Sequence, residues 1–321
     1  MELSEHLIVI FLGILGDSLW GDPIYRLHPI RLLGDLITLL EKALFRLGLK
    51  GYGGGMIHFI LVNATALGIW YGGHELLSQI HPVLPYVWDG FTAFSLLCFH
   101  DLILHGKRVC CSLNDLKQAR YEVSMLVGRD TEKMDQAAVV RATIESLSEN
   151  LVDGVLTPIW VLCLFGLPGL IVMKCISSLD SMIGYKNERY GKFGWTGARS
   201  DDVLHWLPAR LSLPLISFCA LCLRLHPFWT FKSAFKYRKM LHSPNSGWSE
   251  AACAGALGVR LAGPIYQKGV LVNEEYLGED EWPADLNETH LNQALKLILL
   301  CGLVGVISGL ALCPIRLFMP W

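Results

Sequence analysis

Residues 155–176 read VLTPIWVLCLFGLPGLIVMKCI, and this almost uncharged stretch decides the fold class. A helix needs about 20 mainly apolar residues to cross the hydrocarbon core of a bilayer, and the stretch supplies them. Apolar residues make up 52% of the chain and charged residues 17%, with a mean hydropathy of +0.40, whereas average soluble domains carry roughly a quarter charged residues. The sequence therefore predicts an all-α fold, that of a polytopic helical integral membrane protein.

Five further apolar stretches are candidate membrane spans. Two are as clear as the first, and three are shorter or interrupted: residues 56–76 and 295–312, then 7–19, 91–104 and 211–225. The earliest one has no basic residue before it and no small-residue cleavage pattern after it, so we expect a retained span rather than a signal peptide. Lys and Arg accumulate in short cytoplasmic loops. Residues 17–55 contain five of them and residues 77–89 none, so we expect the former inside the cell and the latter outside.

The same rule conflicts with a full span at residues 155–176, because basic residues lie on both sides of it. Residues 105–154 contain seven Lys and Arg, and residues 174–199 contain five. A Gly-Leu-Pro-Gly break at 166–169 would let the stretch form a re-entrant hairpin, and residues 211–225, with Pro214, could behave alike. We predict about four full spans plus one or two re-entrant pieces. All belong to one membrane-embedded domain over residues 1–321, with cytoplasmic polar segments at about 105–154, 177–210 and 226–292.

A helix is predicted from Thr131, a suitable N-cap, to Asp153. Apolar residues three and four apart form one stripe along it: Ala137, Val140, Ile144, Leu147 and Leu151. Beside this stripe, charged residues follow at intervals of four: Arg141, Glu145, Glu149 and Asp153. Carboxylates at this spacing repel one another, and their oxygens suit Mg²⁺ shared with substrate phosphates. A solvated helix face, with Arg141 as an intrahelical partner, is the alternative.

Later polar segments also combine charge with turn signals. Residues 180–190 and 194–202 crowd Lys, Arg and paired acids between apolar stretches, as expected where phosphates and a metal are held. A juxtamembrane loop in water and headgroups explains them equally well. Residues 242–250 begin with His242, a candidate base or phosphate donor, for which a hydrogen-bonded surface histidine is the alternative.

Cysteine usage and net charge argue against two other kinds of site. The ten Cys show no metal-ligand spacing, so thiols buried among helices explain them. The net charge of −2 gives no basic face for nucleic acid, and no nucleic-acid partner is expected.

Taken together, these segments resemble adenosylcobinamide-phosphate synthase, the CbiB/CobD family of cobalamin biosynthesis. The matching blocks follow in the same order along most of the chain: Gly21-Asp22-Pro23 with His28-Pro29-Ile30-Arg31, Glu145-Ser146-Leu147-Ser148-Glu149-Asn150 with Asp153-Gly154, Leu179-Asp180-Ser181-Met182-Ile183-Gly184-Tyr185, Asn187-Glu188-Arg189-Tyr190, Arg199 with Asp201-Asp202, and Ser243-Pro244-Asn245-Ser246-Gly247-Trp248. Two positions depart from the family pattern. Ser177-Ser178 stands where Asn-Thr is usual, and Ser249 stands where Pro is usual.

The resemblance implies an ATP-dependent amide ligase in the inner membrane, with its active site facing the cytoplasm. Such a carbon-nitrogen ligase joins the free propionate of adenosylcobyric acid to the amine of aminopropanol or its O-phosphate, giving adenosylcobinamide or its phosphate. ATP and Mg²⁺ are the implied cofactors, and a corrinoid, aminopropanol or its phosphate and membrane lipid are the implied partners. Contacts with other cobalamin-assembly enzymes, the choice of amine, ADP or AMP as product, and the oligomeric state stay open.

Matched to this sequence, the implied activity gives each candidate residue a role. Glu145, Glu149, Asp153 and Asp180 would bind the metal, and Lys186, Arg189 and Arg199 the phosphates. Asn150, Asn187 and Asn245 would contact phosphate or substrate. Asp201, Asp202 or His242 would deprotonate the incoming ammonium, since only a neutral amine attacks. Trp195, Trp206 and Trp248 would line an interfacial pocket for the corrin ring.

Two other classes of function remain alternatives. A membrane transporter also uses intramembrane breaks with charges beside them, although no paired half-repeat accompanies the break at 166–169. A noncatalytic relative would keep the scaffold as a sensor or binding partner, but the retained Glu, Asp and Arg sets argue against it.

Overall fold

The protein is built almost entirely from helices, as the sequence predicts, in a computed structural model that describes residues 3–23, 25–241 and 243–318. The chain forms two compact units. The first contains residues 1–98, 158–204 and 308–321, and the second contains residues 99–157 and 205–307. Because neither unit is continuous in sequence, no linker marks the boundary between them. The single membrane-embedded domain remains a prediction.

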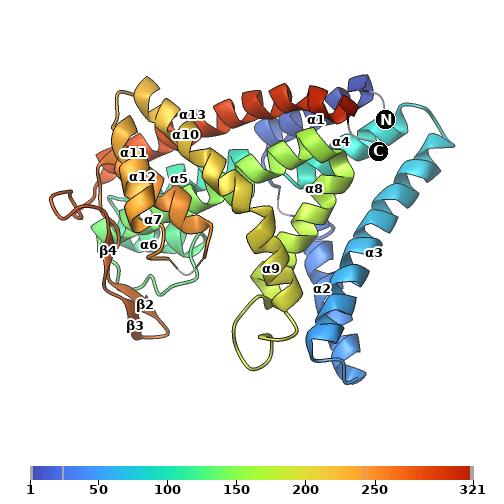
Figure 1. Cartoon of the computed structure of the whole chain (residues 1–321), viewed down its shortest axis with the longest axis horizontal. Helices are drawn as coiled ribbons and strands as arrows, with labels where there is room; N and C mark the ends of the chain where they lie inside the picture. The colour runs from blue at the N-terminus through green and yellow to red at the C-terminus, as the bar shows by residue number, and fades with distance from the viewer. Residues whose placement is uncertain (1–2, 24, 242, 319–321) are drawn as a thin grey trace. The chain divides into compact units, whose positions relative to one another are not determined.

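In its described residues, the first unit contains six α-helices, the end of α13 (Glu288–Leu312) and a short 3₁₀ helix: α1 (Leu3–Trp20), α2 (Pro29–Arg46), α3 (Tyr52–Ser78), α4 (Leu84–Ser95), α8 (Thr157–Ile183), α9 (Trp195–Leu204) and η2 (Cys313–Phe318). Helix α1 packs against α4, and α3 runs beside α2 (Figure 1). Helices α1 and α4 can approach closely because a Cβ on Gly13 would lie only 2.8 Å from that of Ala93. Small residues at such an interface are typical of packed membrane helices.

Helix α8 is interrupted where the sequence predicts a break. Gly166 has φ 72° and ψ −166°, a conformation that other residues adopt only with strain, and Pro168 follows it. The ribbon changes direction along this helix (Figure 1). The break is therefore confirmed, while the re-entrant path through the bilayer stays a prediction.

Among the described residues, six segments are long and apolar enough to cross a membrane: Leu3–Trp20, Tyr52–Ser78, Leu84–Ser112, Gln136–Ile183, Trp195–Cys222 and Glu288–Ile315. Each overlaps one of the six apolar stretches found in the sequence, so the chain is a polytopic helical membrane protein. If residues 155–176 and 211–225 form re-entrant pieces, about four of the segments are full spans. If both stretches cross the membrane, all six are full spans.

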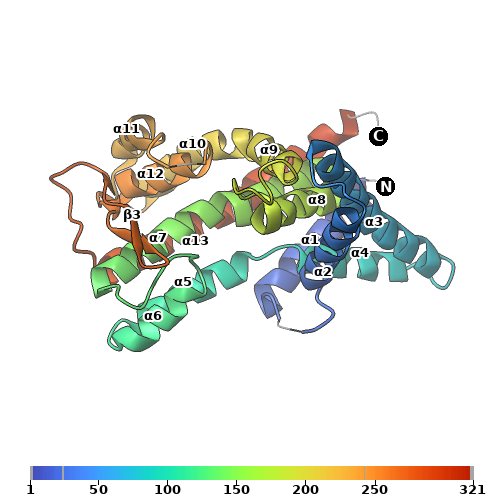
Figure 2. The same cartoon turned by 90° about the horizontal axis from the view of Figure 1, so that it is seen from below.

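The second unit holds the remaining helices: α5 (Phe99–Ser112), α6 (Leu116–Ser124), α7 (Gln136–Asn150), the π-helical segment η1 (Leu151–Leu156), α10 (Trp206–Cys222), α11 (Pro227–Tyr237), α12 (Ser246–Leu257) and most of α13 (Glu288–Leu312). Helices α10, α11 and α12 pack on one another (Figure 2). Helix α7 packs against α5, α6 and α12. This arrangement brings the charged residues of α7 next to the first turns of α12.

The start of α7 corrects one prediction. Thr131 is not the N-cap, because residues 131–134 form a turn closed by the Met134 N–H on the Thr131 carbonyl. Asp135 caps the helix instead, and its Oδ1 accepts a hydrogen bond of 2.7 Å from the backbone N–H of Ala138. The predicted apolar stripe is confirmed, since all five of its members are buried: Ala137, Val140, Ile144, Leu147 and Leu151.

Four very short strands are the only sheet structure in the described residues. Strand β1 (Leu261–Ala262) pairs antiparallel with β4 (Tyr276–Leu277), and β2 (Ile265–Gln267) pairs antiparallel with β3 (Val270–Asn273). Strand β1 packs against α7, where it contacts Arg141 and the predicted site residue Glu145.

Candidate functional site

The charged residues of α7 run from the interior of the second unit to its surface. Arg141 and Glu145 are buried, Glu149 is exposed and Asp153 is partly exposed. Asp153 lies in η1, where the N–H of Thr157 bonds to the carbonyl five residues earlier. A π turn changes the rotation per residue, so Asp153 departs from the line that a spacing of four predicts. Such segments inside helices are frequent at functional sites.

Glu145 and Arg141 are buried and both form hydrogen bonds with strand β1, so a solvated helix face is wrong for both. Oε1 of Glu145 accepts the N–H of Ala262 at 2.8 Å, and Nε of Arg141 donates to the carbonyl of the same residue at 3.2 Å. Ala262 has φ 55°, a left-handed conformation that is rare outside glycine. The second oxygen of Glu145 forms an ion pair with Arg129. Both oxygens of Glu145 therefore have structural partners.

Glu250 of α12 joins these carboxylates. Its side chain is buried, and it interacts electrostatically with Glu149, Glu145 and Asp153. Burial, followed by the charges of Glu149 and Glu145, raises the pKa of Glu250 well above its usual range, against the opposing effect of Arg129. We call Glu145, Glu149, Asp153 and Glu250 the carboxyl cluster. A cation would relieve the repulsion within it.

His205 links this cluster to α10. The histidine is buried directly before the helix, and its Nδ1 lies 3.2 Å from Oδ1 of Asp153 and 3.0 Å from Oγ1 of Thr157. These contacts fix the position of the Asp153 carboxylate relative to the start of α10.

A cation–aromatic cluster is formed by the starts of α10 and α12 and the end of α11, and we define it as Trp206, Arg210, Arg238, Asn245 and Trp248. The guanidinium carbons of Arg210 and Arg238 lie 5.1 and 4.6 Å from the ring centroid of Trp248. Arg210 also lies 4.7 Å from the centroid of Trp206 and donates to Oδ1 of Asn245 at 2.7 Å. The two guanidinium charges are close enough to repel each other, so a bound anion would stabilise both.

The two clusters share the beginning of α12. Trp248 and Glu250 are two residues apart in the first turns of the helix, and Asn245 is its N-cap. The second unit thus combines carboxylates suited to a cation with guanidinium groups suited to an anion. Two of the three tryptophans predicted for a corrin pocket, Trp206 and Trp248, meet around Arg210.

The predicted phosphate ligand Arg189 has an acidic partner within the first unit. Nη2 and Nε of its guanidinium donate to Oε1 of Glu41 in α2 at 2.6 and 3.2 Å, and the Tyr190 hydroxyl donates to the same oxygen at 3.2 Å. Glu41 is buried, whereas most of the Arg189 side chain is exposed. The ion pair attaches the segment between α8 and α9 to α2. Lys186 and Asn187 of this segment are exposed, and Oδ1 of Asn187 accepts the N–H of Tyr190 at 2.9 Å.

The other predicted residues of the first unit gather where the end of α8 meets α9. Nη1 of Arg199 donates to Oδ2 of Asp202 at 2.9 Å, one turn along the helix. Ser177, at a position where the sequence departs from the family pattern, donates to Oδ1 of Asp201 at 2.9 Å. Asp180 is partly exposed one turn beyond Ser177.

Three predicted residues have other surroundings. The Trp195 ring meets the Tyr52 ring edge-on at 5.8 Å in the first unit. Asn150 donates from Nδ2 to the carbonyl of Ser146 at 2.9 Å in the second. His242 lies outside the described residues.

The geometry restricts how a metal could be held. Within the described part of the chain, no group of three or more His, Cys, Asp or Glu side chains is arranged as a preformed metal site. Mg²⁺ commonly uses only one or two carboxylates and completes its octahedron with water and substrate phosphates. Exposed Glu149 and partly exposed Asp153 fit this mode, whereas the hydrogen bonds of Glu145 tie up both of its oxygens.

Three residues of these clusters, Arg210, Arg238 and Glu250, are not predicted from the sequence, and neither is His205 beside Asp153. Arg210 directly precedes the apolar stretch 211–225, within a segment long and apolar enough to span a membrane, and a cation in such a segment is costly and usually has a function. Glu250 follows the block that ends at Trp248, but its burial against α7 depends on tertiary packing.

Comparison with known proteins gives a consistent result. The family model described as CobD/Cbib protein matches residues 10–298. The cobalamin biosynthesis protein CobD of Photorhabdus laumondii is 37% identical over 296 residues, 90% of this chain and 92% of that protein. CobD of Clostridium perfringens is 34% identical (93% and 96% covered), and the cobalamin biosynthesis protein CbiB of Salmonella typhimurium is 35% identical (90% and 96% covered). No solved structure matches the chain significantly.

Proposed function

The chain belongs to the CobD/CbiB protein family, and we propose that it is the ATP-dependent amide ligase of cobalamin biosynthesis that this membership suggests. The reaction joins the free propionate of adenosylcobyric acid to the amine of aminopropanol or its O-phosphate. Its product is adenosylcobinamide or adenosylcobinamide phosphate. The names of the relatives support the pathway, and the site supports the reaction type.

One observation carries the proposal: the second unit contains both the carboxyl cluster and the cation–aromatic cluster, and each cluster includes a residue from the first two turns of α12, Glu250 and Trp248. A carboxylate is a poor electrophile, so amide formation requires its prior activation, which we assign to phosphoryl transfer from ATP with release of ADP. That transfer concentrates negative charge, which cations must offset. Mg²⁺ would supply part of this compensation, with Glu149 and Asp153 as its protein ligands.

The residues around these ligands have distinct tasks in this proposal. Arg210 and Arg238 bind a phosphate group, since guanidinium groups donate to phosphate oxygens in a fixed geometry. Trp248 stacks against both guanidinium groups and fixes their direction. His205 positions Asp153, and Glu145 positions α7 against strand β1.

The roles that the resemblance implies for residues of the first unit remain separate predictions: metal binding for Asp180, phosphate binding for Lys186 and Arg199, and proton acceptance for Asp201 or Asp202. Within that unit, Ser177 donates a hydrogen bond to Asp201, and Arg199 pairs with Asp202. The inner membrane and a cytoplasmic active site also belong to the proposal, since the positively charged polar segments are expected on that side.

The test is ligation by the purified full chain with Mg²⁺, ATP, adenosylcobyric acid and aminopropanol phosphate. We expect ADP release that requires both co-substrates. Glu149→Gln should lower the rate at least about 100-fold, since a metal ligand in phosphoryl transfer contributes several kcal/mol. Glu132→Gln is the matched control, because Glu132 is exposed in the same unit and lies in neither cluster. Equal rates for both variants would reject the metal assignment.

A transporter remains the second candidate because of the break at Gly166 in α8. Discontinuous helices form binding sites in many carriers. Corrinoid uptake into proteoliposomes without ATP cleavage would favour the carrier, whereas ADP release coupled to amide formation would favour the ligase.

A further inference from the structure

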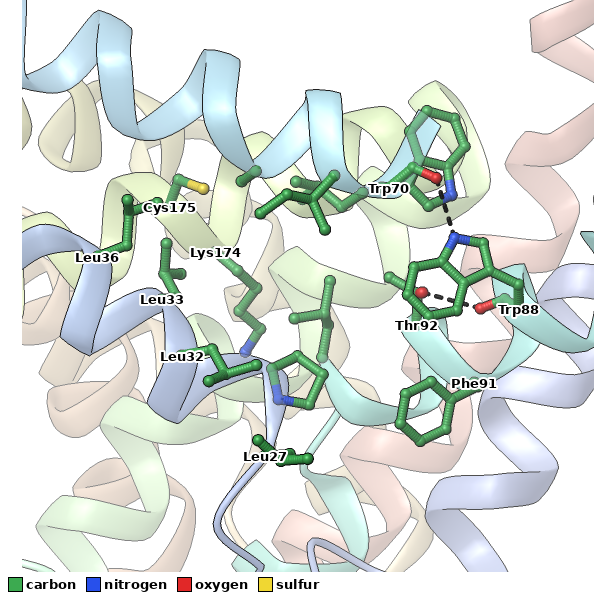
Figure 3. A pocket seen from close by; sticks show the side chains of 15 residues that line it. Leu27, Leu32, Leu33, Leu36, Trp70, Trp88, Phe91, Thr92, Lys174 and Cys175 are labelled. Atoms are coloured by element: carbon green, nitrogen blue, oxygen red, sulfur yellow. Dashed lines mark hydrogen bonds between the residues drawn. The ribbon is translucent and has the colours of Figure 1, made fainter. Parts of the chain in front are cut away.

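A cavity of about 290 Å³ lies in the first unit, among α2, α3, α4 and α8. Its lining is apolar and aromatic apart from Thr92 of α4 and Lys174 of α8 (Figure 3). Its volume is near the lower end of the range for ligand pockets, which is about 300–1,000 Å³. None of the candidate site residues lines it.

The polar atoms of the aromatic end are already satisfied within the protein. Nε1 of Trp70 donates to Oδ1 of Asp89 at 2.8 Å, and Nε1 of Trp88 donates to the Trp70 carbonyl at 2.9 Å. Oγ1 of Thr92 donates to the Trp88 carbonyl at 2.8 Å. Asp89 is buried, and its second oxygen lies 3.1 Å from Nδ1 of His74. These bonds hold the two indoles in fixed positions and leave this end of the cavity with an apolar surface.

Lys174 is therefore the one charged group that a ligand in the cavity would meet. Of the described residues that line the cavity, none is acidic. The lysine side chain points toward Leu32 and Leu27, away from the end formed by Trp70, Trp88 and Phe91 (Figure 3). An ammonium group among apolar side chains is costly unless an anion compensates it. The cavity thus has a cationic end and an apolar end.

The walls of the cavity indicate where its ligand comes from. Helices α3, α4 and α8 all belong to segments long and apolar enough to span a membrane. Leu27, Leu32, Ile69 and Phe91 line the cavity and are exposed, so apolar side chains surround its opening. A bilayer presents molecules with a long apolar chain and an anionic headgroup to such an opening.

We propose that this cavity binds an anionic phospholipid, with one acyl chain between Trp70, Trp88 and Phe91 and the phosphate on the ammonium group of Lys174. The site is separate from the proposed ligase residues, and lipid binding requires neither ATP nor turnover. Its test is therefore independent of the proposed function.

The experiment is native mass spectrometry of the purified full chain, titrated with phosphatidylglycerol or with phosphatidylcholine of the same acyl chains. Lys174→Met removes the charge and keeps the length of the side chain. We expect the affinity for the first bound phosphatidylglycerol to fall about fivefold to tenfold, as for the loss of one lysine–headgroup contact. Lys174→Arg should stay within twofold of the wild-type protein. Phosphatidylcholine binding should not change in either variant.

Two further variants test the place of binding. Lys192→Met is the matched control, since Lys192 is exposed in the same unit and does not line the cavity. Ala66→Phe fills the cavity while keeping Lys174, and should abolish the tight phosphatidylglycerol site at an unchanged unfolding temperature. Equal affinities for Lys174→Met and wild type, an equal loss in Lys192→Met, or a corrinoid mass in place of the lipid would each overturn the proposal.

Discussion

Replacing Glu145 by alanine separates two roles for this carboxylate, structural support and metal binding. The substitution leaves Arg129, whose side chain is only 15% exposed, without its partner, and leaves the N–H of Ala262 without its acceptor. Removing one member of a buried ion pair costs about 3–5 kcal/mol, and an orphaned backbone N–H costs about 1–3 kcal/mol more. Since Arg129 keeps some contact with water, we expect a total loss of about 4 kcal/mol in the free energy of unfolding.

Thermal unfolding of the purified protein without Mg²⁺ measures this loss. For a unit of this size, about 4 kcal/mol corresponds to a fall of roughly 10 °C in the unfolding temperature. A double-mutant cycle with Arg129→Met should give a coupling above about 1 kcal/mol, because the two side chains are in contact. Glu149→Gln, on an exposed side chain, should leave the unfolding temperature unchanged. An unchanged temperature for Glu145→Ala, together with a weakened Mg²⁺ dependence, would instead assign Glu145 to the metal.

Three further substitutions test other parts of the structure. The pKa of Glu250 is raised by burial and then by neighbouring carboxylates, so the folded state holds its proton more tightly than the unfolded state. The free energy of unfolding should therefore fall as pH rises from the ordinary Glu value of 4.5 toward the raised pKa. Glu250→Gln should abolish this slope in thermal unfolding at a series of pH values; an unchanged slope contradicts the assignment. Glu41→Gln should release the segment between α8 and α9, which contains Arg189, from α2 and speed its cleavage by trypsin. An unchanged digestion pattern would contradict this role of the ion pair. Arg238→Met should raise the KM of the phosphate-bearing substrate about tenfold with less effect on kcat, since a charged hydrogen bond is worth about 1.5–3 kcal/mol; an unchanged KM removes it from phosphate binding.

Sequence periodicity predicts the helices well, because apolar spacing and span length are local properties. The six apolar stretches, the break at 166–169 and the buried stripe of α7 all follow from composition and period. The N-cap at Thr131 is wrong: two acceptable caps stand four residues apart, and a turn over residues 131–134 precedes the cap at Asp135. No local sequence pattern marks the π turn of η1. A spacing of four residues therefore predicts the wrong position around the helix for Asp153.

The candidate site was only partly predictable, because sequence blocks reveal residue types and not their partners. The burial of Glu145 depends on strand β1, which lies over one hundred residues further along the chain. The ion pair between Arg189 and Glu41 joins two segments that no spacing rule connects. Arg210 belongs to none of the motif blocks, although its position directly before the apolar stretch 211–225 is itself a signal of a functional charge.

The central claim is that this protein activates a corrinoid carboxylate with ATP. Adenosylcobyric acid labelled with ¹⁸O in its free carboxylate tests it most directly, because an acyl phosphate transfers one labelled oxygen to the released phosphate. We predict ¹⁸O in orthophosphate, in an amount equal to the amide formed and only when the amine is present. Amide formation without label in orthophosphate, or ADP release without amide, would contradict the account.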